Sequence, residues 1–255
     1  LLIMKTQLVD FYIHPLTIIY IAFSIFEKRF SFVIILFLIG LFHELFHVFC
    51  ARIFNLKIKN INVLPIGCFA SIEKLEYAPR KEQLIILLLG PLSFFFTSAI
   101  IKFVTINEFI NKDLYLELMQ ANLLIMIFNL LPIEPLDGGK ILKIFLSSIF
   151  DEYKAIKINA ILGIVFAIII SGILIKIHQY IFAITLLFFG IKNMINIKKD
   201  YKKFLCERLI HKPNYQLKDK INNKLVLYRY NNNYSLNGLN LLTENKIITS
   251  LLYKK

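Results

Sequence analysis

The stretch that decides the fold is Ile34–Ala51, IILFLIGLFHELFHVFCA, an apolar run that contains a His-Glu-x-x-His motif. Within this run the only ionisable side chains besides that of Cys50 are those of His43, Glu44 and His47. Placing a charged side chain at the centre of a membrane helix costs about 2.5–3.5 kcal/mol on insertion scales. Polar residues in this setting need a compensating partner, and their spacing favours a metal ion.

The spacing of the motif also predicts its chemistry. Residues i and i+4 share one face of a helix, so His43 and His47 can offer ring nitrogens to a single Zn²⁺. Glu44 lies beside the first histidine, where it can take a proton from an attacking water and pass it to a leaving amine. The alternative is purely structural: both histidines hydrogen-bond to neighbouring helices, and Glu44 pairs with a lysine.

The composition is that of a protein that crosses a membrane several times. Of the 255 residues, 57% are hydrophobic and 18% are charged, and the mean hydropathy is +0.65. Basic loops next to an anionic bilayer explain the net charge of +13, so we expect a lipid partner and no nucleic acid. The three cysteines, Cys50, Cys68 and Cys206, form no Cys-x-x-Cys pair, so neither a disulfide framework nor a cysteine zinc site is expected.

Apolar segments predict an all-α polytopic membrane protein with about six transmembrane helices. The first segment is short and is expected to continue back through Phe11. We interpret it as a retained span, because it has no clear cleavage site of a signal peptide. The expected spans are 15–26, 30–54, 84–101, 114–131, 158–175 and 180–197. With this count, 25 of the 30 Lys and Arg residues fall on one side, which predicts that both termini are cytoplasmic.

The pattern between the second and third spans is typical of strands. Residues 56–64 alternate apolar and polar side chains, and Pro65-Ile66-Gly67 has the composition of a turn. Residues 69–73, followed by Leu75 and Tyr77, fit a return strand. A short β-hairpin is therefore expected directly after the motif helix, with an edge that could hold a substrate backbone as an added strand. A plain amphiphilic loop remains the alternative.

A catalytic zinc site usually has three protein ligands, so the motif leaves one to be found. Asp137 is the best candidate, because two prolines and two glycines within residues 132–139 break the helix and let the backbone aim its carboxylate. Asp137 could instead cap a short helix that begins at Lys140. The other histidines are His14, which fits an interfacial or substrate-channel position better than a ligand, His178 in an expected solvated turn, and His211.

The motif helix, followed by Asn-x-x-Pro-x-x-x-x-Asp-Gly at 129–138, resembles the site-2 protease family of intramembrane zinc metalloproteases. Within that family the chain is most similar to the stage IV sporulation protein FB group. The shared stretches are Tyr-Ile-His-Pro at 12–15, Leu-Pro-Ile-Gly at 64–67, Leu-Gly-Pro at 89–91, Leu-Leu-Pro-Ile-x-Pro-Leu-Asp-Gly-Gly-Lys at 130–140 and Phe-Leu-x-Glu-Arg at 204–208.

The resemblance implies roles for several side chains. The implied site residues are the ligands of one zinc ion, His43, His47 and Asp137, the acid and base Glu44, and Asn129 and Pro135 near the substrate strand. One departure concerns Cys68, which stands where the group has a second glycine in the hairpin loop.

The other departure from the group is the length of the polar C-terminal part. We expect residues 1–198 to form the protease domain and residues 199–255 a small basic cytoplasmic α/β segment, short for the CBS-type domain of the group. Residues 224–230 have the pattern of a strand, and residues 244–253 have that of a helix. Two interpretations stay open: a reduced CBS-like or winged module, and a solvated basic tail that docks partners.

The expected function is that of an intramembrane zinc metalloendopeptidase in the bacterial cell membrane. The resemblance implies a membrane-associated protein substrate near the cytoplasmic face, a sigma-factor precursor of sporulation, and membrane-protein inhibitors or regulators. One alternative is a general site-2 protease that acts on anti-sigma factors or signal-peptide remnants. A distant alternative is a non-catalytic membrane adaptor, which predicts loss of Glu44 or Asp137, although both are present.

Overall fold

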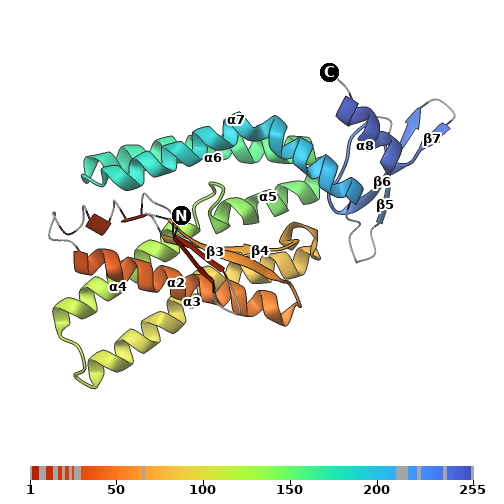
Figure 1. The fold of residues 1–255 in the computed structure, drawn as a ribbon. Helices are drawn as coiled ribbons and strands as arrows, with labels where there is room; N and C mark the ends of the chain where they lie inside the picture. Colours follow the sequence, from red (N-terminus) through yellow and green to blue (C-terminus); the bar gives the residue numbers. More distant parts are fainter. Residues whose placement is uncertain are drawn as a thin grey trace. The chain divides into compact units, whose positions relative to one another are not determined.

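The computed structural model describes residues 2–5, 10–13, 17–18, 21–22, 25, 30–64, 67–210, 218–222, 225–237 and 240–253. These residues are mostly helical, with a short hairpin after the motif helix and a small C-terminal α/β segment, which confirms the predicted fold class (Figure 1). The chain divides into two compact units, residues 1–76 with 81–130 and residues 77–80 with 131–255.

Three helices among the described residues are long and apolar enough to cross a membrane: α2 (Phe30–Ile53), α3 (Arg80–Ile106) and α6 (Glu152–Lys176). On α2 the apolar side chains of Leu38 and Phe49 are 62% and 66% exposed, whereas the polar residues of the motif are buried. Apolar groups on the outside and polar groups on the inside suit a lipid solvent. The chain is thus an integral membrane protein.

From the second expected span on, each expected span falls on a helix, although the number of spans stays a prediction. Spans two, three and five correspond to α2, α3 and α6. The segments expected at 114–131 and 180–197 fall on α4 (Lys112–Asn129) and on the first part of α7 (Tyr180–Ile210). Most of the first expected span lies outside the described residues.

The predicted hairpin is present, directly after α2. Strand β3 (Ile58–Leu64) pairs antiparallel with β4 (Gly67–Ile72), so the plain-loop alternative is wrong. The return strand is shorter than predicted, because residues 75–77 form a 3₁₀ helix, η1 (Leu75–Tyr77). The backbone leaves the ladder at Glu73 and Lys74, which form a turn in which Lys74 has a φ of 58°.

The N-terminal stretch differs from the prediction. Strands β1 (Leu2–Lys5) and β2 (Asp10–Ile13) extend the hairpin to a four-stranded sheet in the order β1-β2-β3-β4, with β2 parallel to β3. Phe11 therefore belongs to a strand and not to the first span. The physical reason is the open edge of β3, whose backbone N–H and C=O groups pair with β2. A prediction of spans from runs of apolar residues does not take into account that a segment can pair with a strand from a distant part of the chain.

Two packing contacts fix the motif helix in the first unit. Ile35 and Ile39 of α2 pack with the fully buried Ala121 of α4. Further along, Cys50 and Ala51 of α2 pack with Ile86 of α3. Small side chains at these contacts allow the helices to approach closely, as in other membrane proteins.

The second unit is organised around a helical hairpin. Helices α6 and α7 lie side by side, and α5 (Asp137–Ile149) packs against α6 (Figure 1). Gly190 of α7 faces α6 so closely that a β-carbon there would lie 2.9 Å from the Ile164 side chain. Ser171 Oγ donates to the Ala183 carbonyl at 2.8 Å, a polar bond between two apolar helices.

The C-terminal segment is partly different from the prediction. Helix α8 (Glu244–Tyr253) has the predicted bounds, but residues 225–230 are irregular. The strands are β5 (Lys218–Asn222), β6 (Asn231–Asn237) and β7 (Asn240–Leu242). The apolar alternation of 224–230 serves packing instead, because Leu227 lies in a core with Ile247, Ile248, Phe204 and Leu205. The expected domain boundary at residue 198 stays a prediction.

Candidate metal centre

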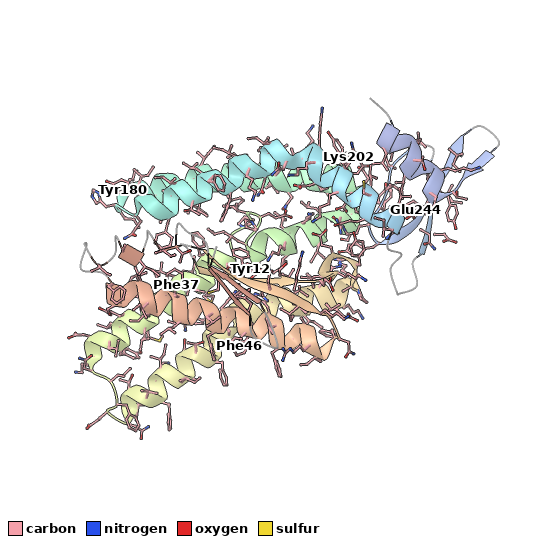
Figure 2. All side chains as sticks on the ribbon, viewed as in Figure 1. Tyr12, Phe37, Phe46, Tyr180, Lys202 and Glu244 are labelled. Carbon is pink, nitrogen blue, oxygen red and sulfur yellow. The ribbon has the colours of Figure 1, made fainter. Side chains whose placement is uncertain are left out.

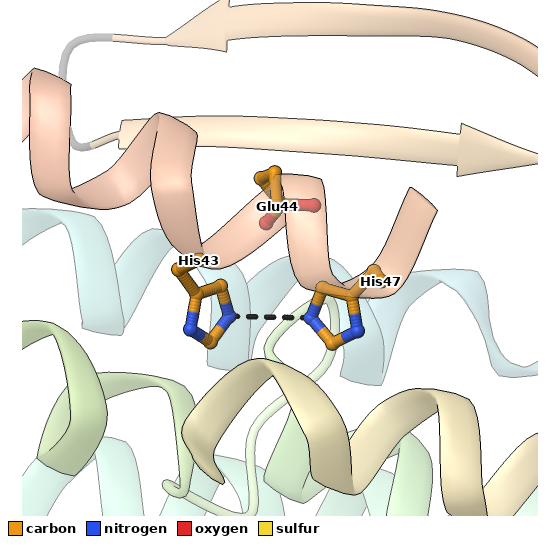
Figure 3. Close-up of side chains that lie close together, drawn as sticks. All are labelled: His43, Glu44 and His47. Carbon is orange, nitrogen blue, oxygen red and sulfur yellow. Dashed lines mark hydrogen bonds between the residues drawn. The ribbon is translucent and has the colours of Figure 1, made fainter. Parts of the chain in front are cut away.

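Helix α2 brings the three motif side chains together in the interior of the first unit. His43, Glu44 and His47 are 2%, 6% and 4% exposed, and one ligand atom from each lies within 4.8 Å of the others. Figure 3 shows the two imidazoles next to each other and Glu44 on the turn between them. This is the arrangement that the i, i+4 spacing predicts.

One hydrogen bond fixes the ring of His47. Its Nδ1 lies 2.8 Å from the carbonyl oxygen of Ile86 on α3. Because a carbonyl can only accept, Nδ1 carries the proton and Nε2 is the unprotonated nitrogen that can bind a metal. A backbone carbonyl on the other ring nitrogen is the usual support of a metal-binding histidine.

The two Nε2 atoms face each other. They lie 3.2 Å apart, with the ring planes at 81° (Figure 3). Two nitrogens that bind one tetrahedral zinc at about 2.0–2.1 Å are separated by roughly 3.3 Å, so the pair fits a shared Zn²⁺.

Gly90 of α3 leaves room for the imidazoles of His43 and His47. A β-carbon there would lie 2.8 Å from His43 Nε2 and still closer to His47 Nε2 and Cε1. Only a residue without a side chain fits over the two imidazoles. The neighbouring Pro91 has no N–H, so it cannot donate the usual helical hydrogen bond to the carbonyl of residue 87.

Strand β4 orients the carboxylate of the motif. The Ala70 N–H donates to Glu44 Oε2 at 2.8 Å. In the part of the chain that the structure describes, no ion pair joins Glu44 to a lysine, so the lysine partner of the structural alternative is absent there. The bond links the hairpin to the motif helix and holds Glu44 beside the histidines.

Cys68 lies in β4, close to the same carboxylate. Its side chain is buried with those of Val48 and Ile61. Burial raises the pKa of the Cys68 thiol to about 12, and the negative charge of Glu44 adds to the rise. The thiol therefore stays protonated and packs as a small apolar group.

Asp137 is the first residue of α5 in the second unit. It is 3% exposed, and its Oδ1 lies 3.2 Å from the Lys140 ammonium. The helix begins at Asp137 itself, and Leu136 is the N-cap without a side-chain hydrogen bond. Asp137 thus does not cap a helix from Lys140, and that alternative is wrong. Its role as the third ligand stays a prediction.

The remaining predicted residues differ in how far the structure describes them. Asn129 ends α4, and its Nδ2 donates to the Ile125 carbonyl at 3.0 Å. Pro135 is half-buried and follows a cis peptide bond. His178 lies in an exposed turn, 2.8 Å from the Tyr180 hydroxyl, as expected of a solvated residue. His14 and His211 lie outside the described residues.

Sequence reasoning missed the supporting groups of the site. The Ile86 carbonyl and the Ala70 N–H are backbone groups, which every residue carries, so no sequence signal marks them. Gly90 does have a signal, because it stands in the Leu-Gly-Pro stretch of the third span. The Lys140 partner of Asp137 follows from the i, i+3 spacing on a helix.

Comparisons with known proteins show which family the chain resembles. The chain matches the model of peptidase family M50 over residues 31–112 and 109–172. Stage IV sporulation protein FB of Bacillus subtilis is 29% identical over 160 residues, 63% of this chain and 56% of that protein. A zinc metalloprotease of Methanocaldococcus jannaschii is 36% identical over 133 residues, 51% of this chain and 38% of that protein. The matches thus span little more than half of the first relative and less than half of the second.

A solved structure is similar as well. The site-2 protease from Methanocaldococcus jannaschii matches with a TM-score of 0.60 and 28% identity, over 76% of this chain and 94% of that one. The family match includes α2 with its complete motif, and it continues through residue 172, well beyond Asp137. The chain belongs to peptidase family M50, the family of the site-2 proteases.

Proposed function

We propose that this chain is an intramembrane zinc metalloendopeptidase that cuts a membrane-associated protein near the cytoplasmic face. The observation that carries the proposal is the pair of buried Nε2 atoms 3.2 Å apart, with Glu44 on the same helix, in a family of metalloproteases. In this proposal His43, His47 and Asp137 hold one Zn²⁺. As a Lewis acid, zinc would polarise the scissile carbonyl and make water acidic enough to ionise near neutral pH.

In this proposal the side chains of the motif have separate roles in the reaction. Glu44, held by the Ala70 N–H, takes a proton from the attacking water and gives it to the departing amine. His47 is kept in the ligand tautomer by the Ile86 carbonyl. Burial of all three side chains of the motif limits access of bulk water and strengthens the electrostatic interactions among them.

The substrate must be extended at the scissile bond, because a helix keeps its carbonyls in internal hydrogen bonds. We propose that the substrate strand pairs with the hairpin, as the sequence suggested. The edge of β3 away from β4 is occupied by β2, whereas among the described residues no strand pairs with the outer edge of β4, which lies next to α2. Asn129 and Pro135 are proposed to lie near this strand, on the strength of the family motif.

The proposed substrate is a sigma-factor precursor, in keeping with the similarity to stage IV sporulation protein FB. The alternative is a general site-2 protease that acts on anti-sigma factors or signal-peptide remnants, which the similarity to the archaeal zinc metalloprotease equally allows. Co-expression with one representative of each class separates them: the true class is cut, and the others stay intact. Membrane-protein regulators and cytoplasmic termini belong to the same proposal.

The acid/base role is tested with Glu44→Gln. Because Glu44 is not a ligand, the variant should contain about as much zinc as the wild type and should not cut a co-expressed substrate. His47→Ala should lose both zinc and activity. Glu73→Gln is the matched control, since Glu73 is an exposed glutamate of the same unit. Retained cleavage in Glu44→Gln would refute the mechanism.

The third ligand is tested by metal content. Asp137→Asn keeps the shape of the side chain but removes the charge that offsets part of the charge of zinc, so zinc content and activity should both fall. If His14 were the ligand, His14→Ala would lose the metal and Asp137→Asn would keep it. Normal zinc in purified Asp137→Asn would exclude Asp137 from the site.

A further inference from the structure

The segment that precedes Asp137 is held by three helices of the second unit. It runs from Leu131 to Leu136 between α4 and α5, and its apolar side chains Ile133 and Leu136 are 0% and 2% exposed. A backbone hydrogen bond of 2.9 Å holds the turn, in which the Leu136 N–H donates to the Ile133 carbonyl. The segment is thus a compact turn that leads directly into the first residue of α5.

Glu134 is the centre of the contacts that hold this turn. Its Oε1 accepts a hydrogen bond of 3.1 Å from Asn159 Nδ2 of α6 and lies 3.3 Å from the Lys143 ammonium of α5. Its backbone carbonyl accepts a 2.7 Å hydrogen bond from Asn193 Nδ2 of α7. One residue therefore receives a donor from each of the three helices, although the family motif leaves position 134 unspecified.

The first turn of α5 is packed directly on this segment. A β-carbon at Gly139 would lie 2.8 Å from the Ile133 carbonyl oxygen and still closer to the backbone nitrogen of Glu134. Gly139 and Asp137 belong to the same helical turn, so a shift of the Glu134 backbone moves the backbone that carries the Asp137 carboxylate. Packed turns of this kind transmit displacements because protein interiors are dense.

Packing alone does not explain Asn159. The residue is 5% exposed, and among the described residues its Oδ1 has no hydrogen-bond partner, although its Nδ2 donates to Glu134. A buried amide with an unpaired oxygen costs free energy that an apolar residue of similar size would avoid. The role of Asn159 is therefore to hold Glu134 and not to fill space.

We propose that Glu134 is a positioning residue for the zinc ligand Asp137, and that Asn159 and Asn193 act through it. This inference rests on the proposed function, because it requires Asp137 to bind zinc. Loss of the Glu134 carboxylate should weaken zinc binding without removing any ligand. Residues that support metal ligands typically change metal affinity by about 10–100-fold when they are replaced.

The test measures zinc affinity of the purified full chain in detergent, by competition with a chelator, and the thermal unfolding of the zinc-free protein. Glu134→Ala should weaken zinc binding by about tenfold or more. Glu134→Gln can still accept from Asn159 and should recover part of the loss. Asn159→Leu should weaken zinc binding less than Glu134→Ala, because Lys143 and Asn193 still hold the turn. The double variant Glu134→Ala with Asn159→Leu should bind zinc no more weakly than Glu134→Ala alone. Glu73→Ala is the control and should bind zinc like the wild type.

Three results would overturn the proposal, and the third of them differs from the first two in what it says about the function. If Glu134→Ala binds zinc like the wild type while Asp137→Ala binds it weakly, Glu134 does not position the ligand and the proposed function stands. A drop in the unfolding temperature without a change in zinc affinity leads to the same conclusion. If Asp137→Ala itself binds zinc like the wild type, the ligand assignment fails and the positioning role fails with it.

Discussion

At the residue scale, Gly90 gives the sharpest prediction. A β-carbon at this position would enter the space between the two imidazoles, 2.8 Å from His43 Nε2. Gly90→Ala should therefore displace both rings and abolish zinc binding and cleavage, although alanine favours a helix by about 1 kcal/mol over glycine. Zinc content per chain after purification is the measurement.

The chain offers a matched control for this substitution. Gly172 lies in α6, and a β-carbon there would meet nothing within 4 Å. Gly172→Ala makes the same chemical change in a membrane helix and should keep wild-type zinc content. If Gly90→Ala also keeps its zinc, the imidazoles do not approach the α3 backbone as described.

A second prediction at this scale concerns the Cys68 thiol. Its pKa is raised to about 12 by burial and then by Glu44, from an ordinary value of 9.0. A raised pKa means less thiolate, so at pH 8 Cys68 should carry about a thousandfold less of the reactive form than an ordinary thiol. Alkylation followed by mass spectrometry should label the exposed Cys206 and leave Cys68 unlabelled until the pH approaches 12 or the chain unfolds. Labelling of Cys68 at a rate like that of Cys206 at pH 8 would contradict its burial.

At the element scale, the Phe-Leu-x-Glu-Arg stretch at the end of α7 joins the helical hairpin to the C-terminal segment. Phe204 and Leu205 lie in the core of that segment with Leu227. Glu207 accepts a 2.6 Å hydrogen bond from the Tyr77 hydroxyl of η1. Arg208 pairs with Glu244 at the start of α8 at 2.6 Å and donates to two backbone carbonyls, those of Arg229 and Asn231. Lys202, by contrast, stands on the exposed surface of α7 (Figure 2).

The buried ion pair beside this stretch should dominate the stability of the junction. Arg229 donates twice to Glu152 at the start of α6, and its guanidinium lies 4.8 Å from the centre of the Phe204 ring. Glu152 is fully buried, so Arg229→Ala leaves a carboxylate without its partner and should destabilise the protein by about 3–5 kcal/mol. Chemical unfolding of the purified protein measures the loss.

Two further variants show whether Arg229→Ala loses stability because the buried Glu152 carboxylate has lost its partner. The double variant Glu152→Gln with Arg229→Met removes both charges and should be less destabilised than Arg229→Ala. Lys203→Ala breaks an exposed 3.7 Å pair with Glu207 and should change stability by less than about 1 kcal/mol. Equal stabilities of Arg229→Ala and Lys203→Ala would mean that the buried pair contributes little.

At the scale of the whole molecule, the sequence predicts the elements and contacts that are determined by residues close together in the chain. Continuous apolar runs predicted α2, α3 and α6. Alternation predicted β3, and the turn composition of residues 65–67 predicted β4 as its return strand. The His-Glu-x-x-His spacing predicted the cluster on α2. The sequence does not predict elements that are determined by contacts with residues far away in the chain. Strand β2 exists because the edge of β3 is open, and residues 225–230 are irregular because Leu227 packs under α8. The backbone groups that orient Glu44 and His47 belong to this second class.

The last prediction concerns the orientation of the chain in the membrane. Arg80 and Lys81 begin α3, whereas its last turn has no basic residue, and the next helix starts at Lys112. Because basic residues resist transfer across the membrane, the start of α3 should be cytoplasmic and the turn at 107–111 should face the other side. A topology reporter fused after Lys112 should report the outer side, and the same reporter after Lys255 should report the cytoplasm. Reporters on the same side of the membrane would mean that the number of spans between these points is even and that six spans with cytoplasmic termini is wrong.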